Sequence, residues 1–355
     1  MDKQRLGDGE IVGGVDTHKP AHVAAVVDRT GRLLGTFEFP TTSAGYRELL
    51  RWLREHGSVS VVGVEGTGSY GAGLARYLAR EGVAVVEVIR PNRQLRQRRG
   101  KSDPIDAEAA ARAALSKEAN TTPKSADGPV EAMRMIRLAR CSAVKARTQA
   151  ANQIDALVTC APQSLRSQLK ELSVLRLAER ARRWRPRDIQ DPLSACRATI
   201  KGLAQRWSQL GAEIAGYDKQ LLRLTQRVCP ELLARPGVGF EVASSLLVAA
   251  GDNPDRLHSE ASFAALCGVS PLDASSGQQR RHRLNRGGNR DANRALWVVA
   301  MTRLRVDERT QAYAARRTKQ GRTKREILRC LKRYIARELY SILRCNTLAR
   351  PLDVT

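Results

Sequence analysis

The sequence has few aromatic residues, no closely paired cysteines and no long apolar runs. Phe, Trp and Tyr make up 4% of its 355 residues, so base-stacking platforms are not expected to dominate any nucleic-acid contact. The seven cysteines stand singly, without a C-x-x-C pair, which argues against a zinc site and fits buried thiols in a reducing cytoplasm. No apolar run approaches the roughly 18 residues that span a bilayer, and the first residues form no signal peptide. We therefore expect a cytoplasmic protein without a membrane partner.

Acidic residues are scarce in the C-terminal third. Residues 277–345 contain twenty Lys or Arg and five Asp or Glu, a net charge of +15, whereas residues 1–88 have a net charge of −1. The whole chain has a formal net charge of +25 and a pI of about 10.6. A positive charge of this size indicates a polyanionic partner, and nucleic acid fits better than an anionic membrane. When bound to DNA, such a protein would be associated with the nucleoid.

The element pattern predicts an α/β domain followed by mainly helical regions. In the first 125 residues, apolar runs predict strands at 11–16, 22–28, 32–39, 60–65 and 83–89 and helices at 42–56, 71–81 and 105–115. Three strands, a helix, a strand, a helix and a strand is the order of a ribonuclease-H-type mixed sheet. Ser43 is the predicted N-cap of the first helix. We predict domains at 1–125, 126–228 and 229–355.

Four carboxylates stand where such a sheet can bring them together. Asp16 ends the first apolar run, Glu65 ends the fourth, and Asp103 and Asp106 begin an alanine-rich helix. In this fold Asp16 and Glu65 would lie side by side on neighbouring strands. Carboxylate oxygens are the ligands that Mg²⁺ prefers, and two such ions can stabilise the attacking and leaving oxygens in phosphate chemistry. The pattern predicts a magnesium site made by these four residues.

An ordinary helix start is an alternative explanation for two of them. In Asp103-Pro104-Ile105-Asp106, Asp103 is a good N-cap, the proline suits the first helical position and Asp106 suits the third. Asp16 and Glu65 can each be a solvated strand end or the partner of a basic residue. The occurrence of all four together favours metal binding.

The middle region predicts a helical arm. Apolar residues recur with alternating spacings of three and four, a heptad seam of four repeats. These are Ile200, Leu203, Trp207, Leu210, Ile214, Tyr217, Leu221, Leu224 and Val228. The pattern predicts a coiled coil, formed within one chain or between two, and we favour a dimerising arm. An amphipathic helix packed on its own domain is the alternative.

Candidate nucleic-acid contacts lie in three places. Pro236-Gly237-Val238-Gly239 resembles the turn of a helix-hairpin-helix, whose glycines and second helix can bind a phosphate backbone. An ordinary helical hairpin without a ligand is the alternative. Two arginine-rich segments supply the other candidates, with an ordinary solvated face as the alternative for each. The basic candidates are Arg90, Arg93, Arg96, Arg98, Arg99, Lys101, Arg280, Arg281, Arg283, Arg286 and Arg290. Just before the second segment, Ser275-Ser276-Gly277 is either a turn or a serine nucleophile beside guanidinium groups.

Several motifs, taken in order, resemble those of the transposases of DEDD-type insertion sequences, which are bridge-RNA-guided serine recombinases with a RuvC-like domain. The resemblance covers nearly the whole chain. The motifs are Gly13-Gly-Val-Asp16-Thr-His-Lys, Val64-Glu65-Gly-Thr-Gly-Ser-Tyr70, Lys101-Ser-Asp103-Pro-Ile-Asp106-Ala, Pro236-Gly-Val-Gly239 and Gly268-Val-Ser-Pro271 to Ser276-Gly277.

This resemblance implies a RuvC-like N-terminal domain and a C-terminal transposase domain. It implies that Asp16, Glu65, Asp103 and Asp106 bind Mg²⁺ and that Ser276 is the covalent nucleophile, with Ser275 as the alternative hydroxyl. It also implies double-stranded donor and target DNA as substrates, a noncoding guide RNA, and homodimers that pair into a tetramer. There, the serine of one subunit completes the active site of another.

The function expected from these features is RNA-guided cleavage and strand exchange of DNA by a magnesium-dependent transposase. Two alternatives remain at this stage. One is a hydrolytic, RuvC-like junction-resolving nuclease that uses the four acids and water. The other is a non-enzymatic nucleic-acid-binding protein in which the acids are helix caps and surface charges.

Overall fold

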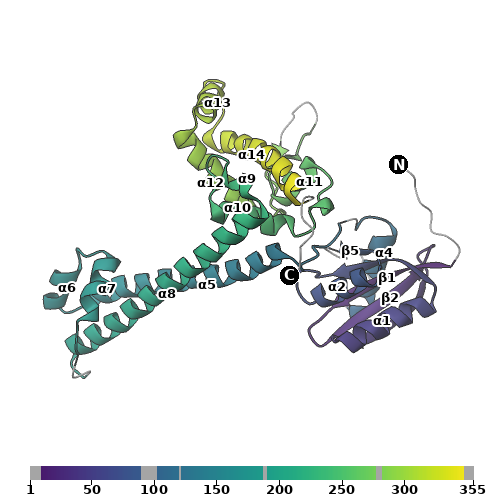
Figure 1. The fold of residues 1–355 in the computed structure, drawn as a ribbon, viewed down its shortest axis with the longest axis horizontal. Coiled ribbons are helices and arrows are strands. Elements are labelled where there is room, and N and C mark those ends of the chain that lie inside the picture. The colour runs from purple at the N-terminus through teal and green to yellow at the C-terminus, as the bar shows by residue number, and fades with distance from the viewer. Residues whose placement is uncertain (1–8, 89–101, 120, 187–189, 277–281, 348–355) are drawn as a thin grey trace. The chain divides into compact units, whose positions relative to one another are not determined.

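The computed structural model describes residues 9–88, 102–119, 121–186, 190–276 and 282–347 (Figure 1). The chain divides into two compact units. The first unit comprises residues 1–127 with 251–258, and the second comprises 128–250 with 259–355. The three domains expected from the sequence remain a prediction.

The first unit contains one five-stranded mixed sheet, as predicted for a ribonuclease-H-type fold. The strands are β1 (Glu10–Thr17), β2 (Ala21–Asp28), β3 (Leu33–Pro40), β4 (Ser58–Glu65) and β5 (Val85–Val88), in the order β3-β2-β1-β4-β5. The three N-terminal strands are antiparallel, whereas β4 runs parallel to both β1 and β5. Strand β1 therefore has a neighbour on each side, and its C-terminal end lies beside that of β4.

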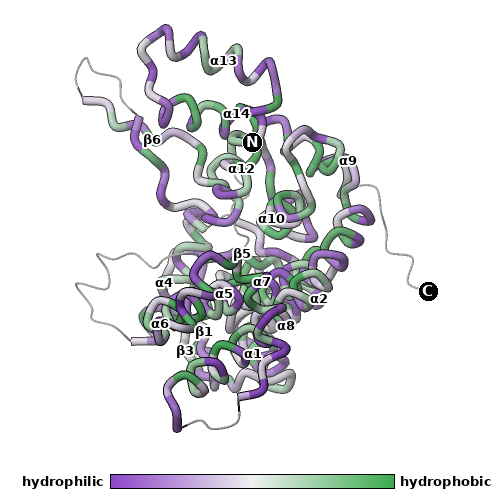
Figure 2. Tube along the Cα trace, turned by 90° about the vertical axis from the view of Figure 1, so that its left-hand side faces the viewer, coloured by the Kyte–Doolittle hydropathy of each residue, from purple (hydrophilic) through white to green (hydrophobic). Residues whose placement is uncertain are grey.

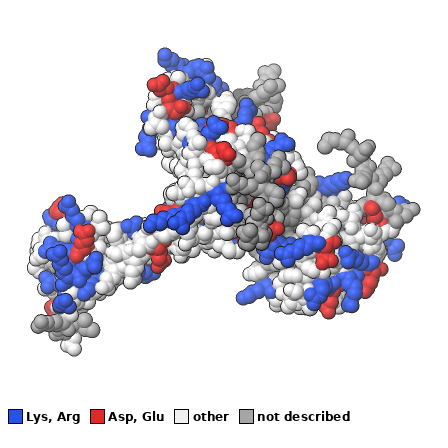
Figure 3. Space-filling view, viewed as in Figure 1, with Lys and Arg blue, Asp and Glu red and all other residues white. Residues whose placement is uncertain are grey.

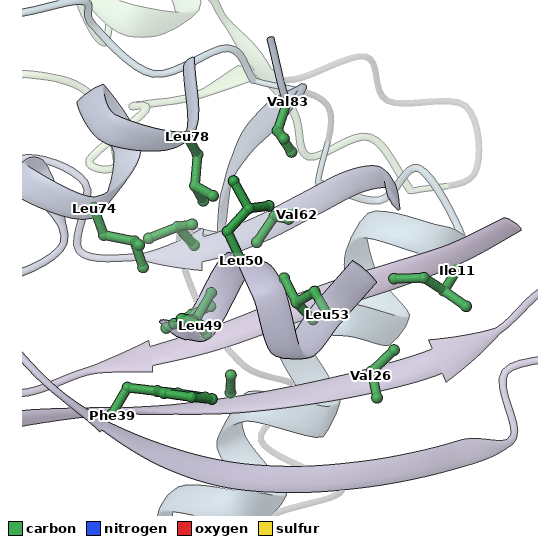
Figure 4. Close-up of a cluster of buried hydrophobic side chains, with 13 residues drawn as sticks. Ile11, Val26, Phe39, Leu49, Leu50, Leu53, Val62, Leu74, Leu78 and Val83 are labelled. Atoms are coloured by element: carbon green, nitrogen blue, oxygen red, sulfur yellow. The ribbon is translucent and has the colours of Figure 1, made fainter. Parts of the chain in front are cut away.

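Helices cover both faces of this sheet, which explains why β1 and β2 are apolar along almost their whole length. Helices α1 (Ser43–Glu55) and α2 (Ala72–Arg80) supply Leu49, Leu50, Leu53, Leu74 and Leu78 to the core on one face (Figure 4). Helix α4 (Asp103–Leu115) packs its alanines against the other face. The hydroxyl of Thr42 caps α1 by accepting from the Gly45 N–H at 3.1 Å, so the predicted cap at Ser43 is wrong by one residue.

A glycine in β1 allows α4 to approach the sheet closely. A Cβ atom on Gly14 would lie 2.1 Å from the backbone nitrogen of Ala111 and 2.3 Å from the carbonyl oxygen of Ala107. A Cβ atom on Gly63 in β4 would likewise lie 2.6 Å from the carbonyl oxygen of Ala110. Two strand glycines and a row of alanines therefore set the distance at which α4 places its first turn.

A short segment from the middle of the sequence completes the first unit. Residues 251–258, which include the 3₁₀ turn Pro254–Arg256, lie against residues 122–125. The Asn253 side chain accepts from the Ser125 N–H at 3.0 Å and donates to the Pro123 carbonyl at 2.8 Å. Arg256 Nε donates to the Thr122 carbonyl at 3.0 Å. These bonds join segments that are about 130 residues apart in sequence.

The second unit begins with a helical arm. Helices α5 (Pro129–Cys160) and α8 (Pro192–Val228) pack along each other, with α6 (Gln163–Leu169) and α7 (Val174–Arg182) between them in sequence (Figure 1). On the α8 seam, the Trp207 ring lies under the Arg147 guanidinium at 4.0 Å, and Leu221 is fully buried. Asp218 pairs with Arg140 of α5. The seam therefore packs within one chain, and dimerisation through the arm remains a prediction.

The rest of the second unit is mainly helical. Its elements are α9 (Pro230–Leu233), α10 (Phe240–Ala250), α11 (Glu260–Leu266), α12 (Arg290–Val306), α13 (Glu308–Lys319), α14 (Lys324–Thr347) and the two-residue strands β6 (Leu272–Asp273) and β7 (His282–Arg283). Figure 2 shows that α10 is mostly hydrophobic whereas α13 is mostly hydrophilic. Helix α10 is accordingly buried along most of its length and packs against α12. Within the described part of the chain, the helices lack the combination of length and apolar character that a membrane span needs.

The cysteines are not all buried, contrary to what the sequence suggested. Cys141 and Cys160 on α5 are exposed, whereas Cys229 and Cys267 are buried. The expectation of buried thiols is therefore wrong for the two cysteines of α5.

Candidate active site

The end of β1 places Asp16 at the edge of the sheet beside Glu65. Val15 pairs with Val64 in the parallel β1–β4 register, so the next residue of each strand is one of the two acids. The Thr17 hydroxyl donates to the Glu65 carbonyl at 2.9 Å and ties the two strand ends together. Asp16 is buried and Glu65 is half-buried. Asp16 and Glu65 therefore lie side by side at the ends of adjacent strands, as the sequence predicted.

A histidine joins this site, and the sequence interpretation missed it. His18 Nε2 lies 3.1 Å from Asp16 Oδ2 and 3.5 Å from Asp103 Oδ1. Ligand atoms of Asp16, His18 and Asp103 all lie within 4.8 Å of one another. The signal was present in the spacing, because His18 stands two residues after Asp16, just past the end of β1, and residues two apart in an extended chain point to the same side. The spacing of the histidines relative to one another does not reveal this cluster, because its other members are aspartates.

Charge is concentrated around Asp16. Burial is the main cause that raises the pKa of the Asp16 carboxyl, with the negative charges of Asp106 and Asp103 adding to it and His18 opposing it. Asp106 lies in the first turn of α4 and is only 3% exposed. The fold therefore gathers several carboxyl groups in a partly desolvated place, at an electrostatic cost that a cation would offset.

The donor set at this edge fits a divalent cation. Asp16 and Asp103 offer carboxylate oxygens, and His18 offers a ring nitrogen within the same cluster. Asp106 and Glu65, predicted with them, lie at the start of the same helix and at the end of the neighbouring strand. Oxygen ligands suit Mg²⁺, and an added imidazole also suits transition metals.

The helix-cap alternative fails for Asp103. Ser102 occupies the N-cap position of α4, Asp103 is the first helical residue, and Pro104 is the second. Asp103 is half exposed and directs an oxygen towards His18 rather than closing the helix end. The first turn therefore presents Asp103 to the end of β1.

The serine motif lies in the β6–β7 hairpin of the second unit, where Leu272 pairs with Arg283. The Ser275 hydroxyl and its backbone N–H both bond Asp273 Oδ1, the latter at 2.9 Å. The hydrogen bond from the Ser275 hydroxyl is the main cause that lowers the pKa of Asp273. Ser276 is exposed, and its side chain has no hydrogen bond to any residue that the structure describes. The two hydroxyls therefore differ in surroundings.

The other predicted contacts are only partly described. Arg90, Arg93, Arg96, Arg98, Arg99, Lys101, Arg280 and Arg281 lie outside the described residues. Three of the predicted arginines are described and exposed: Arg283 on β7, Arg286 between β7 and α12, and Arg290 at the start of α12.

Gly237 and Gly239 precede α10, as predicted. Gly237 has a φ of +78°, a conformation that suits glycine, and a Cβ on Gly239 would meet no atom within 4 Å. Arg303 holds the loop by donating to the Pro236 carbonyl at 2.9 Å.

Comparisons with known families decide the classification. Residues 13–161 match the family model for DEDD transposases of IS110, described as "Transposase". Residues 229–315 match the model described as "Transposase IS116/IS110/IS902 family". The first segment contains the four predicted acids and the second contains Ser276. The chain belongs to the IS110 family of transposases.

Two relatives from Streptomyces coelicolor agree with this assignment. The "Mini-circle putative transposase for IS117" is 26% identical over 369 aligned positions, which cover 87% of each chain. The "Insertion element IS110 uncharacterized 43.6 kDa protein" is 33% identical over 119 residues, which cover 33% of this chain and 29% of that relative. As a member of the IS110 family, this chain is a DNA transposase, and the resemblance seen in its motifs is confirmed.

Proposed function

We propose that this IS110-family transposase is a magnesium-dependent, RNA-guided DNA recombinase in which Ser276 is the nucleophile. The observation that carries the proposal is the convergence of Asp16, His18 and Asp103 at the end of β1, in a chain whose second matched segment contains an exposed serine. A metal site and a separate nucleophile are the two parts that such chemistry needs.

In this proposal Asp16 and Asp103 hold the metal, with Glu65 and Asp106 as the other members of the predicted tetrad. His18 is an additional donor, since its Nε2 faces both aspartates. When bound, the metal supplies Lewis acidity at a phosphate oxygen. The protein's own part is to fix the ligands in place, and α4 does this through its close contact with β1.

The covalent step belongs to Ser276. Its Oγ attacks the scissile phosphorus and loses its proton, a new P–Oγ bond forms, and the bond from phosphorus to one deoxyribose oxygen breaks. The departing oxygen takes up a proton as a free hydroxyl group. A hydroxyl of another strand then attacks the phosphoserine and releases Ser276 unchanged. Each step exchanges one phosphate ester for another, so no external energy source is required.

The hairpin geometry supports Ser276 rather than Ser275 as the attacking group. The hydroxyl and backbone N–H of Ser275 both bond the Asp273 carboxylate, an arrangement typical of a turn. Ser276 is exposed at the end of the same turn. In this proposal Ser275 shapes the hairpin and Ser276 meets the DNA.

The charge distribution supports a nucleic-acid partner of considerable length. Figure 3 shows Lys and Arg side chains over α13 and around α6 and α7 near the end of the arm. Together with the net charge of +25, this supports binding of both a guide RNA and DNA through their phosphates. Homodimers that pair into a tetramer, with serine and acids supplied by different subunits, complete the proposal.

A strand-exchange assay with purified protein, guide RNA, Mg²⁺ and labelled donor and target DNA tests this function. The expected result is exchange that requires both RNA and metal and is abolished in Asp16→Asn and in Ser276→Ala, but retained in Ser275→Ala. Cleavage that needs Asp16 and is indifferent to Ser276 would instead identify a hydrolytic nuclease. Strand exchange in the absence of RNA would overturn the RNA-guided part of the proposal and leave the roles of the metal and Ser276 unchanged.

A further inference from the structure

A basic groove with an exposed indole lies next to the serine hairpin in the second unit. It has a volume of about 610 Å³ and is lined by Gly268, by the segment that follows β7 and by the start of α12. Three of the lining residues are Arg286, Arg290 and Arg294, all exposed. Trp297 also lines the groove and is 46% exposed. No carboxylate occurs among the lining residues described for this groove.

One face of α12 carries most of the groove. Arg290, Arg294 and Trp297 are spaced by four and three residues, so their side chains share one side of the helix. The opposite side is anchored in the core through Leu296 and Val299. A tryptophan in a core position would be buried, whereas this one directs a large flat ring into a hollow surrounded by positive charge.

The floor of the groove is fixed by an asparagine. Asn293 donates from Nδ2 to the carbonyl of Cys267 at 2.8 Å and to that of Gly268 at 3.2 Å. Its Oδ1 accepts from Lys332 Nζ at 2.9 Å, and this lysine is buried. A Cβ on Gly288 would lie 2.2 Å from the Gly268 nitrogen, so the two chain segments are in direct contact. The arginines and the indole therefore project from a rigid base.

The groove adjoins the segment that carries the proposed nucleophile. Leu284 follows β7 directly and lines the groove, and its neighbour Arg283 pairs with Leu272 of the serine hairpin. An acidic residue at the start of α12, Asp291, is not among the residues that line the groove. The surface next to the hairpin is thus positively charged and partly aromatic.

This combination is selective for one kind of ligand. Paired bases inside a duplex have no free face to offer an indole, so duplex DNA can use only the arginines. An unpaired nucleotide offers both a phosphate for the guanidinium groups and a base that stacks on the ring. A ligand that is an anion alone would leave the exposed indole without a role.

We propose that this groove, which we call the Trp297 groove, binds an unpaired nucleotide of a DNA strand, with the base stacked on Trp297 and the phosphate held by Arg290 and Arg294. The proposal rests on the proposed function, because it places this nucleotide next to the phosphate that Ser276 attacks. Strand exchange requires base pairs to open near the cleavage point, and the groove would keep one opened nucleotide from pairing again.

Binding of short duplexes tests the Trp297 groove. One duplex is fully paired, and the other carries a single unpaired 2-aminopurine, whose fluorescence falls when it stacks on an aromatic ring. Metal is omitted so that no cleavage occurs. The wild-type chain should bind the second duplex roughly tenfold more tightly, the effect of one base–aromatic contact, with quenched fluorescence. Trp297→Ala should lose both the preference and the quenching.

Matched variants separate stacking from general damage. Trp297→Phe retains a flat ring and should recover most of the preference. Val306→Ala removes another exposed apolar side chain of α12, 68% exposed and outside the groove, and should behave as wild type. All variants should keep wild-type affinity for the paired duplex.

Three outcomes would overturn the proposal. If Trp297→Ala keeps the preference, the groove is not the site, although the proposed function stands. If the preference appears only with an unpaired ribonucleotide probe, the occupant is RNA rather than DNA. If the wild-type chain binds both duplexes equally, the groove does not hold an unpaired nucleotide, and the proposed function stands.

Discussion

Replacement of Gly14 by alanine tests how the metal ligands are positioned. The added Cβ would lie 2.1 Å from the Ala111 nitrogen, whereas ordinary contact begins at 3.4 Å. Because the atoms it meets are backbone atoms of α4, the helix has to retreat by about 1.3 Å. Overpacking of this severity costs about 3 kcal/mol. The retreat also carries Asp103 and Asp106 away from Asp16.

The neighbouring glycine provides the control. A Cβ on Gly13 would lie 3.2 Å from side-chain atoms of Leu53 and Val62, on the other face of the sheet. The flexible ends of these side chains can move slightly, and alanine removes some of the entropic penalty of glycine in a strand. Gly13→Ala should therefore change stability by less than about 1 kcal/mol.

Hydrogen exchange measured by mass spectrometry on the full chain reads both effects locally. In Gly14→Ala, amide protection in β1 and α4 should fall roughly 100-fold, as about 3 kcal/mol implies. Gly13→Ala should leave it nearly unchanged, and peptides of the second unit should not respond to either variant. Equal protection in the two variants would show that the close contact between α4 and β1 does not hold the site together.

Three further predictions concern other parts of the molecule. His18→Asn should weaken the binding of Co²⁺, measured by visible absorption, about tenfold more than it weakens the binding of Mg²⁺, because imidazole favours the softer ion. Equal losses for the two ions would argue against direct ligation by His18. Leu138→Glu, at a position 67% exposed on α5, should halve the mass measured by light scattering if the arm dimerises; an unchanged mass would contradict this. Asn253→Ala removes two hydrogen bonds to residues 123 and 125 and should cost about 1–3 kcal/mol locally, seen as faster proteolysis of residues 121–127; unchanged cleavage would mean the segment is held by other contacts.

The sheet of the first unit was predictable because its sequence signals are local. Buried strands such as β1 and β4 are continuous apolar runs that end at Asp16 and Glu65, and the parallel register brings these ends together. The caps were less predictable. Thr42 and Ser43 both carry hydroxyls that can cap α1, and only the backbone conformation decides between them.

Long-range features escaped the sequence interpretation for a physical reason. Residues 251–258 join the first unit through Asn253 and Arg256, and no local periodicity encodes a contact across about 130 residues. The low aromatic content argued against extensive stacking, yet a single exposed indole on α12 becomes informative once the surrounding arginines are located in space. His18 was predictable in principle from its spacing to Asp16, whereas its distance to Asp103 depends on where α4 packs.

Mass spectrometry of protein–DNA adducts tests the central claim most directly. The transposase is incubated with Mg²⁺, guide RNA and a DNA substrate that cannot religate, then denatured and digested with protease and nuclease. The account predicts a nucleotide attached through phosphate to the peptide that contains Ser276, absent in Ser276→Ala and in Asp16→Asn. Attachment at another residue, or efficient cleavage with no attached nucleotide, would contradict it.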